Sequence, residues 1–402
     1  MSTFIQISSG GGSGVFGISN SSGKYTYYAT LTLAMAAATS GQTIEMFADV
    51  VETGAVILTL KDGVNINGNG HTYILNNSGL LNAFLTPTTA GVKISILNFH
   101  GIRTGSTGTV YDNSFIASFT APSGLINCAG STFTNLGSGC AIMSASGIEF
   151  INATATANTD FGSLGAFGSI SVFTNCRAYS TTGFAIRLHT GGSIANNCYG
   201  FSNSGVGVYG GYYATISNCT GVSVSGTGIE NFGDTSNSTG RSVSGNGYVQ
   251  NGYGIGMNCT GISVSGAGIL NYVSMANSTG LSSSSYGIRM GYGVTYNSTA
   301  KSISGPAMWN TNGNPQLYNV IAISEWNNVA AYGLRGNGGM FPNALINCTF
   351  ILANASAPYL FNDGVAQAIS LKGNTYKGGA VFNANLTQAI TATQDNQGNI
   401  YL

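Results

Sequence analysis

The sequence predicts an all-β protein, a single-stranded right-handed parallel β-helix with about 20 residues per coil. Three observations lead to this fold class. A short sequence motif repeats with a period near 20 residues, glycine makes up 60 of the 402 residues, and β-branched and aromatic residues alternate with serine, threonine and asparagine. Only 6% of the residues are charged, so the composition is not that of a disordered chain. The composition barely changes between residues 40 and 380, which indicates one long repetitive domain.

An asparagine followed by cysteine or serine recurs in the middle of the chain, and successive members are 22, 21, 19, 21, 19 and 20 residues apart. The members are Asn175, Asn197, Asn218, Asn237, Asn258, Asn277 and Asn297. Between these asparagines a second sequence motif repeats, as in residues 221–229 (GVSVSGTGI) and 261–269 (GISVSGAGI). At about 3.3 Å per strand residue, this period accommodates three short strands and three bends, which make one coil of a solenoid.

We interpret the repeated asparagines as a structural ladder that points into the coils. Stacked coils lie about 4.8 Å apart, so each amide can bond the next asparagine and the local backbone. Such bonds satisfy polar groups that burial would otherwise leave without partners. Several of these residues also begin glycosylation-like triplets, as in Asn218-Cys-Thr. Glycan attachment is the alternative interpretation, and it explains the period less well.

Four segments are expected along the chain. Residues 1–28, rich in serine and glycine, lie outside the repeat and are expected to attach to a larger assembly, with a flexible leader as the alternative. Residues 29–41 are expected to form a capping helix, because Thr30 can cap a short amphipathic stretch. Residues 42–380 are expected to form the β-helix. Residues 381–402 are expected to cover the last coil or to contact a neighbouring subunit, since an uncapped end is a sticky edge.

Charge and hydropathy narrow the range of partners. The 12 basic and 12 acidic side chains are dispersed and give a formal net charge of zero, so no nucleic-acid partner is expected. The longest apolar runs, such as residues 55–60, are far shorter than the roughly 20 residues of a membrane span, so no membrane insertion is expected. The first residues lack the basic and apolar regions of a signal peptide, and we expect synthesis in the cytoplasm without one.

The cysteines do not suggest a disulfide framework or a metal site. Seven is an odd number, six of them follow an asparagine, and five of these six stand at the repeat-related positions. These five are Cys176, Cys198, Cys219, Cys259 and Cys348. We expect reduced, buried thiols that pack as small apolar residues. Because no CxxC motif or His/Cys cluster is present, no metal and no cofactor are expected.

The order of elements near the start carries a resemblance to a known family. A helix over residues 30–41 precedes a strand-like segment, 42–50, and a Gly–Asn-rich coil, 64–73 (VNINGNGHTY). This order resembles the opening of pectin-lyase-like parallel β-helices, most of all bacteriophage tailspike and tail-fibre proteins. The resemblance covers residues 29–380 and is one of architecture. It implies a structural virion protein that is commonly a homotrimer, joins other virion or tail proteins through residues 1–28 and contacts host surface polysaccharide.

The carboxylates argue against an enzyme without deciding the question. Glycoside hydrolysis needs two carboxylates, and elimination needs acidic calcium ligands with a basic residue. The sequence has no Asp-Asp or Asp-x-Asp cluster, and the family's Asn-Thr-Asp, Gly-His-Gly and Arg-Ile-Lys signatures are missing. A dispersed pair can still converge across stacked coils. The weak catalytic candidates are Glu230, Asp234 and His189, although an exposed Glu near Arg is more typical of a surface ion pair.

Aromatic residues recur at one point of successive coils and suggest a surface for sugar rings, which stack on aromatic faces. This column contains Tyr212, Phe232, Tyr253, Tyr272 and Tyr292. The outward positions that follow the repeated Gly-x-Gly-Ile motif add further rings and hydrogen-bond donors to this candidate glycan-binding surface, namely Arg187, Tyr209, Arg289 and Trp309. The alternative is an internal or interfacial aromatic stack. The direction of the side chains decides between the two.

The sequence is consistent with three functions. The favoured one is a non-enzymatic virion component of tail-fibre or spike type that contacts host glycan. The second is a polysaccharide depolymerase, which a cleft with two carboxylates roughly 5 to 10 Å apart would support. The third is a bacterial surface adhesin, which a longer gene product with an export signal would support.

Overall fold

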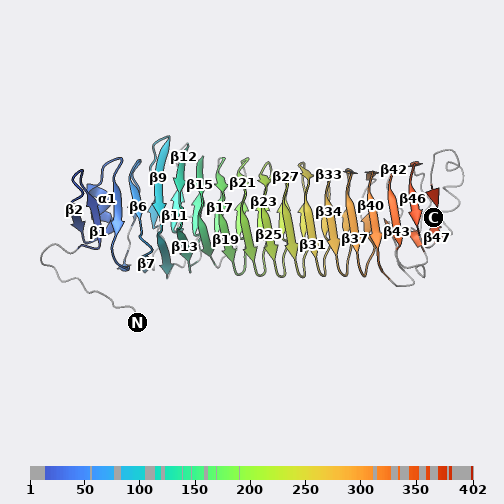
Figure 1. The fold of residues 1–402 in the computed structure, drawn as a ribbon, viewed down its shortest axis with the longest axis horizontal. Helices are drawn as coiled ribbons and strands as arrows, with labels where there is room; N and C mark the ends of the chain where they lie inside the picture. Colours follow the sequence, from blue (N-terminus) through green and yellow to red (C-terminus); the bar gives the residue numbers. More distant parts are fainter. Residues whose placement is uncertain are drawn as a thin grey trace. The chain divides into compact units, whose positions relative to one another are not determined.

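The computed structural model divides into two compact units, unit 1 (residues 1–202) and unit 2 (residues 203–402). The structure describes residues 14–54, 57–76, 83–104, 114–118, 123–137, 139–145, 147–157, 162–168, 170–189, 191–310, 315–326, 334–335, 344–352, 359–362, 370–377, 380–382 and 400–401. Each unit is a stack of coils, and each regular coil contributes one strand to each of three parallel sheets, which we name I, II and III (Figure 1).

Unit 1 begins with a cap built from a hairpin and a helix. Strand β1 (Phe16–Ser19) pairs antiparallel with β2 (Tyr25–Tyr28) and with β3 (Thr43–Met46). Helix α1 (Leu31–Ala37) begins at Thr30, whose side chain accepts a hydrogen bond from the backbone N–H of Leu33. Residues 16–28 thus belong to a hairpin that pairs with β3, while residues 1–13 lie outside the described residues. No helix in the described part of the chain is long and apolar enough to cross a membrane.

In unit 1 every third strand along the chain belongs to the same sheet. Sheet I contains β3, β6 (Asn65–Asn67), β9 (Val92–Leu97), β12 (Gly124–Asn127), β15 (Ile148–Ile151), β18 (Val172–Thr174) and β21 (Ile194–Asn196). Sheet II contains β4 (Val50–Thr53), β7 (Thr72–Asn76), β10 (His100–Thr104), β13 (Thr132–Asn135), β16 (Thr154–Ala157), β19 (Arg177–Ser180) and β22 (Tyr199–Ser202). Sheet III contains β5 (Leu58–Thr59), β8 (Phe84–Leu85), β11 (Ile116–Ser118), β14 (Ile142–Ser144), β17 (Leu164–Ala166) and β20 (Ile186–Leu188).

Unit 2 continues the same pattern. Its sheet I contains β24 (Thr215–Ser217), β27 (Asp234–Ser236), β30 (Ile255–Met257), β33 (Ser274–Ala276), β36 (Val294–Tyr296), β39 (Gln316–Tyr318), β42 (Ala344–Ile346) and β45 (Ser370–Lys372). Its sheet II contains β25 (Thr220–Ser223), β28 (Thr239–Ser242), β31 (Thr260–Ser263), β34 (Thr279–Ser282), β37 (Thr299–Ser302), β40 (Ile321–Ser324), β43 (Thr349–Leu352), β46 (Thr375–Lys377) and β48 (Ile400–Tyr401). Its sheet III contains β23 (Val208–Gly210), β26 (Ile229–Asn231), β29 (Tyr248–Gln250), β32 (Ile269–Asn271), β35 (Ile288–Met290), β38 (Met308–Asn310), β41 (Leu334–Arg335), β44 (Tyr359–Asn362) and β47 (Ala380–Phe382).

The predicted all-β, right-handed parallel β-helix is confirmed. Strands three elements apart pair in parallel, and the register advances by one coil at each step. Thr220 pairs with Thr239, and Thr239 pairs with Thr260, so neighbouring coils differ by 19 and 21 residues. These are the spacings that the repeated asparagines predict, because one corner residue is needed per coil.

The cores of the two units differ. Unit 1 is filled by stacked rings: Phe99 lies 5.8 Å from Phe84 and 6.2 Å from Phe133 between ring centroids. In four successive coils of unit 2 glycine takes the inward position of sheet II, at Gly221, Gly240, Gly261 and Gly280. A Cβ atom on Gly221 would overlap the carbonyl oxygen of Gly228 in the same coil. These four strands therefore pack directly on backbone, which explains why glycine stands at this position.

The repeated asparagines form an external corner, and the expectation that they point inward is wrong. All seven are exposed, with φ angles between 46° and 54°. Asparagine tolerates this left-handed conformation better than other residues with a side chain. The amides still bond along the stack: Asn197 donates to Asn175 Oδ1 (2.7 Å), and Asn258 donates to Asn237 Oδ1 (3.0 Å). The period thus reports a backbone requirement at the corner of each coil.

Serine and cysteine form the buried polar columns. A buried serine ends six successive strands of sheet II in unit 2, at Ser223, Ser242, Ser263, Ser282, Ser302 and Ser324. A second column follows the asparagine corner, where the backbone N–H of Cys219 donates to Ser238 Oγ (3.1 Å) and that of Cys259 to Ser278 Oγ (3.1 Å). All seven cysteines are free and buried, in agreement with the sequence-based expectation.

Candidate functional site

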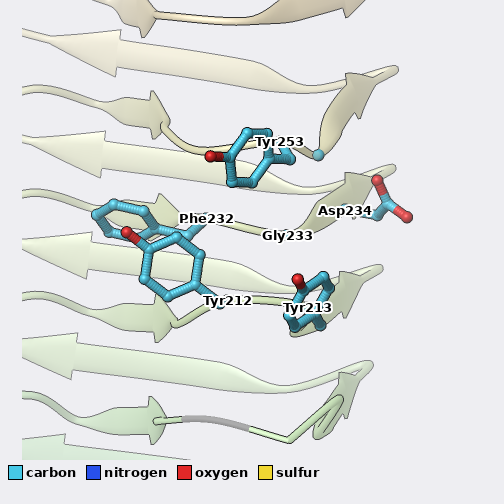
Figure 2. A pocket seen from close by; sticks show the side chains of 7 residues that line it. Tyr212, Tyr213, Phe232, Gly233, Asp234 and Tyr253 are labelled. Carbon is cyan, nitrogen blue, oxygen red and sulfur yellow. The ribbon is translucent and has the colours of Figure 1, made fainter.

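Two hollows lie on either side of Phe232 in unit 2. The first, which we name the tyrosine groove, is lined by Tyr212, Tyr213, Phe232, Gly233, Asp234, Tyr253 and Gly254. The second, which we name the sheet III groove, is lined by Thr227, Glu230, Phe232, Asn246, Val249, Asn251, Leu270 and Tyr272. Figure 2 shows the tyrosine groove, where rings from successive coils gather at the turn between sheet III and sheet I.

The predicted aromatic column points outward. Tyr212, Tyr253 and Tyr292 are 53%, 83% and 59% exposed, and Phe232 and Tyr272 are partly buried. The alternative of an internal stack is therefore wrong. Rings exposed to this degree contribute little to the core of their own coil. They offer apolar faces to a molecule that approaches from outside.

Phe232 is the wall shared by both grooves. Its ring centroid lies 5.3 Å from that of Tyr212, at an interplanar angle of 53°. On the other side it lies 6.1 Å from the ring of Tyr209, at 58°. Inclined rings of this kind present faces in different directions, so a bound ring can contact one face while its edge meets another.

Tyr213 belongs to the site and was missed by the sequence analysis. It lines the tyrosine groove and is 76% exposed. The segment between the strand of sheet III and the asparagine corner is two residues longer in this coil than in the next one. A count forward from the strand therefore reaches Tyr212 before Tyr213. Counting back from the asparagine corner finds it: Tyr213 stands five residues before Asn218, as Phe232 stands five before Asn237.

Asp234 lies at the edge of the tyrosine groove. Its Oδ1 accepts a 2.9 Å hydrogen bond from the backbone N–H of Ile255 in the next coil. In Figure 2 its carboxylate points away from Phe232 and Tyr212. This geometry makes Asp234 a support of the stacked backbone.

Glu230 lies on the floor of the sheet III groove. Asn251 Nδ2 donates a 3.1 Å hydrogen bond to its Oε1. Burial raises the pKa of Glu230 above its ordinary value, and the hydrogen bond from Asn251 opposes this shift. Glu230 and Asp234 line different grooves on opposite sides of Phe232, so the structure does not join them into the carboxylate pair that hydrolysis requires.

The outward residues of sheet III form a continuous column in unit 2. Each member pairs with the next in the parallel register, in the order Tyr209, Glu230, Val249, Leu270, Arg289 and Trp309. At the far end, the Arg289 guanidinium carbon lies 4.6 Å from the Trp309 ring centroid. Within the column an acid, Glu230, and a cation, Arg289, are separated by two aliphatic side chains.

Arg187 and His189 belong to unit 1 and form a separate cluster. The Arg187 guanidinium carbon lies 4.8 Å from the Phe184 ring centroid and 5.7 Å from that of Phe167. The His189 ring lies 6.0 Å from Phe167. Partial burial, and then the charge of Arg187, lower the pKa of His189, which favours the neutral imidazole.

Within the described residues, no group of three or more His, Cys, Asp or Glu side chains is arranged to hold a metal ion. The ion pairs of the described part are Lys301 with Glu325 (2.6 Å) and His71 with Asp49 (3.4 Å). Neither pair lies among the residues that line the two grooves.

No family model matches the sequence, and no curated protein matches it. Among solved structures, the A-module of a mannuronan C-5 epimerase from Azotobacter vinelandii is similar over 92% of this chain and 93% of its own, with 12% sequence identity and a TM-score of 0.30. The two grooves are therefore the features of the chain that bear on its function.

Proposed function

We propose that the chain is a structural virion protein of tail-fibre or spike type, whose β-helix attaches to a larger particle and contacts host surface glycan. One observation carries the glycan-binding part of the proposal. Four exposed or partly exposed rings from three successive coils, Tyr212, Tyr213, Phe232 and Tyr253, face one groove. Sugar rings stack on such faces through their C–H groups and bond through their hydroxyls.

The scaffold suits a role outside the cell. Hydrogen bonds run from coil to coil through the asparagine corner and the buried serines, so the grooves lie on turns that neighbouring coils hold in place. Rigid positioning lowers the entropic cost of binding. Attachment through the segment 1–28, assembly as a homotrimer and location in the virion are further parts of the proposal. They rest on the architectural resemblance.

The test is glycan binding by the full chain and by ring-deletion variants. Tyr253→Ala and Tyr212→Ala are each expected to weaken binding of host surface polysaccharide about 2- to 10-fold, because an aromatic contact contributes about 0.5–1.5 kcal/mol. Tyr296→Ala is the matched control. Tyr296 is also exposed, but it stacks on Tyr318 at 5.2 Å and lines neither groove. Equal losses for Tyr253→Ala and Tyr296→Ala contradict the assignment of the groove.

A second candidate function is a polysaccharide depolymerase, and Glu230 is the observation that favours it. A groove-facing carboxyl with a raised pKa can donate a proton to a leaving group. Against it, Glu230 is the one carboxylate among the residues that line this groove in the described part of the chain. Incubation with purified surface polysaccharide decides the matter. A shortening of the polymer that Glu230→Gln abolishes supports the depolymerase, and an unchanged chain length supports binding alone.

A further inference from the structure

Arg289 stands at the end of the sheet III groove. In the register of sheet III it pairs with Leu270, which lines that groove. Its guanidinium lies over the ring of Trp309, and the Trp309 ring lies 4.4 Å from that of Tyr286, at an interplanar angle of 36°. Trp309, itself packed against Tyr286, therefore holds the cation in place, and stacking leaves the planar edge of a guanidinium available for hydrogen bonding.

The cation has no counter-ion of its own in the described part of the chain. The Nε atom of Arg289 is buried there without a hydrogen-bond partner. The ion pairs formed by the described residues, Lys301–Glu325 and His71–Asp49, do not include it. Removing a charged donor from water without giving it an acceptor is costly. Because Nε itself is buried, an incoming oxyanion would meet the outer nitrogens of this partly exposed side chain and would supply the counter-charge there.

A related but not identical arrangement occurs in unit 1: Arg187 lies over Phe184, three residues earlier in the chain, whereas Arg289 lies over Trp309 of the next coil. Arg187 follows Phe184 by three residues, as Arg289 follows Tyr286 by three. In both cases the guanidinium lies over an aromatic ring, at 4.8 Å from Phe184 and at 4.6 Å from Trp309.

We propose that Arg289, backed by Trp309 and Tyr286, binds the carboxylate of an acidic sugar, and that the glycan extends from there along the sheet III groove toward Glu230. This inference rests on the proposed glycan-binding function and names the ligand class of the site. A carboxylate matches the fork of a guanidinium in a planar, bidentate contact. The acidic sugar lies at the arginine end because the Glu230 carboxyl disfavours a second carboxylate beside it.

The dimensions of the groove agree with a short run of linked sugars. Three register steps separate Glu230 from Arg289, which at about 4.8 Å per step gives about 14 Å. Val249 and Leu270 lie between them on the floor, and Tyr272 forms part of the wall. The apolar floor and the Tyr272 ring of the wall suit the C–H faces of pyranose rings. Asn246 and Asn251 supply side-chain amides that can hydrogen-bond the sugar hydroxyls.

The test uses trigalacturonate and triglucuronate, each beside its carboxyl-reduced counterpart, in calorimetric titrations of the full chain. The chain is expected to bind the acidic trisaccharide of at least one pair about tenfold more tightly than its neutral form, and added salt is expected to shrink this preference. Arg289→Gln should remove the preference and leave binding of the neutral form unchanged. Arg289→Lys keeps the charge but loses the fork, and an intermediate preference is expected.

Arg241→Gln is the matched control. Arg241 is an exposed arginine of unit 2 on β28 and lines neither groove. Loss of the preference in this variant as well as in Arg289→Gln would mean a general charge effect and would overturn the inference. Equal binding of acidic and neutral trisaccharides by the unaltered chain would overturn it too, while leaving the proposed function intact. If no trisaccharide and no host polysaccharide binds, the proposed function fails together with the inference.

Discussion

The hydroxyl of Ser263 donates a 2.6 Å hydrogen bond to the carbonyl oxygen of Gly245, one coil earlier, and accepts a 2.8 Å bond from the backbone N–H of Gly266. The same two bonds recur one coil before, where Ser242 donates to Gly226 (2.6 Å) and accepts from Gly245 (2.9 Å). Each buried serine thus joins two coils at a turn that glycine makes tight. This column carries the internal polar role that the sequence analysis assigned to asparagine.

Ser263→Ala is expected to lower the free energy of unfolding by about 1–3 kcal/mol. The substitution leaves the Gly245 carbonyl and the Gly266 N–H without their partner in a buried place. Chemical denaturation followed by circular dichroism measures the change. Ser265→Ala, two residues away on the exposed surface, is the control and should stay within about 0.5 kcal/mol of the unaltered protein. Equal effects for the two variants would contradict the role of the serine column.

Asn258 is expected to tolerate glycine and to resist alanine. Its φ of 53° lies in the left-handed region, where a Cβ costs about 1–2 kcal/mol and glycine none. Asn258→Ala should therefore lower the melting temperature clearly more than Asn258→Gly, although both lose the amide bond to Asn237. Because the side chain is exposed, Asn258→Lys is expected to fold with a loss like that of alanine. A failure of the lysine variant to fold would point back to an inward side chain.

Much of the fold could be predicted from the sequence because one backbone requirement recurs in every coil. A left-handed corner selects asparagine at positions such as Asn218 and Asn237, and the spacing of these residues reports the coil length directly. The direction of the asparagine side chain could not be predicted, because burial and a left-handed φ both favour a repeated asparagine. Likewise, the period fixes the position of Tyr253 in its coil but not its direction, which depends on how the turn after sheet III folds.

The thiols are expected to be unreactive in the folded protein. Burial raises the pKa of Cys259 and of Cys348 to about 11, and that of Cys140 to about 12. Since the thiolate is the nucleophile, alkylation at neutral pH should label none of the seven cysteines until the chain unfolds. Mass spectrometry before and after denaturation measures this. Labelling of Cys259 at native conditions, or a melting temperature that falls in reducing agent, would contradict free and buried thiols.

The raised pKa of Glu230 predicts a pH dependence of stability. Burial disfavours the charged carboxylate in the folded chain, so the unfolded chain loses this proton at lower pH than the folded one. The contribution of Glu230 to stability is therefore most favourable below its unfolded pKa and is lost as the pH rises through its folded pKa. Glu230→Gln should remove this part of the dependence. Unfolding free energies at about pH 4 and about pH 8 test it, and parallel pH profiles for the two proteins would contradict it.

Tyr213 combines strain with a place in the binding site, and its replacement should separate stability from function. Among the described residues with positive φ that are not glycine, it is the one that is not asparagine, with φ of 64°. Its ring is largely exposed, so little packing is lost on deletion. Tyr213→Gly is expected to raise the free energy of unfolding by up to about 1 kcal/mol and to weaken glycan binding.

Tyr253→Gly is the matched control for this prediction, because it removes an exposed ring of the same groove from a residue without positive φ. It should weaken binding in the same way and lower stability by about 0.5–1 kcal/mol, the entropic cost of an added glycine. Opposite changes in melting temperature with parallel losses of affinity would mean that Tyr213 keeps an unfavourable backbone because its ring is needed in the groove. Equal destabilisation by both substitutions would show that the φ of Tyr213 stores no strain.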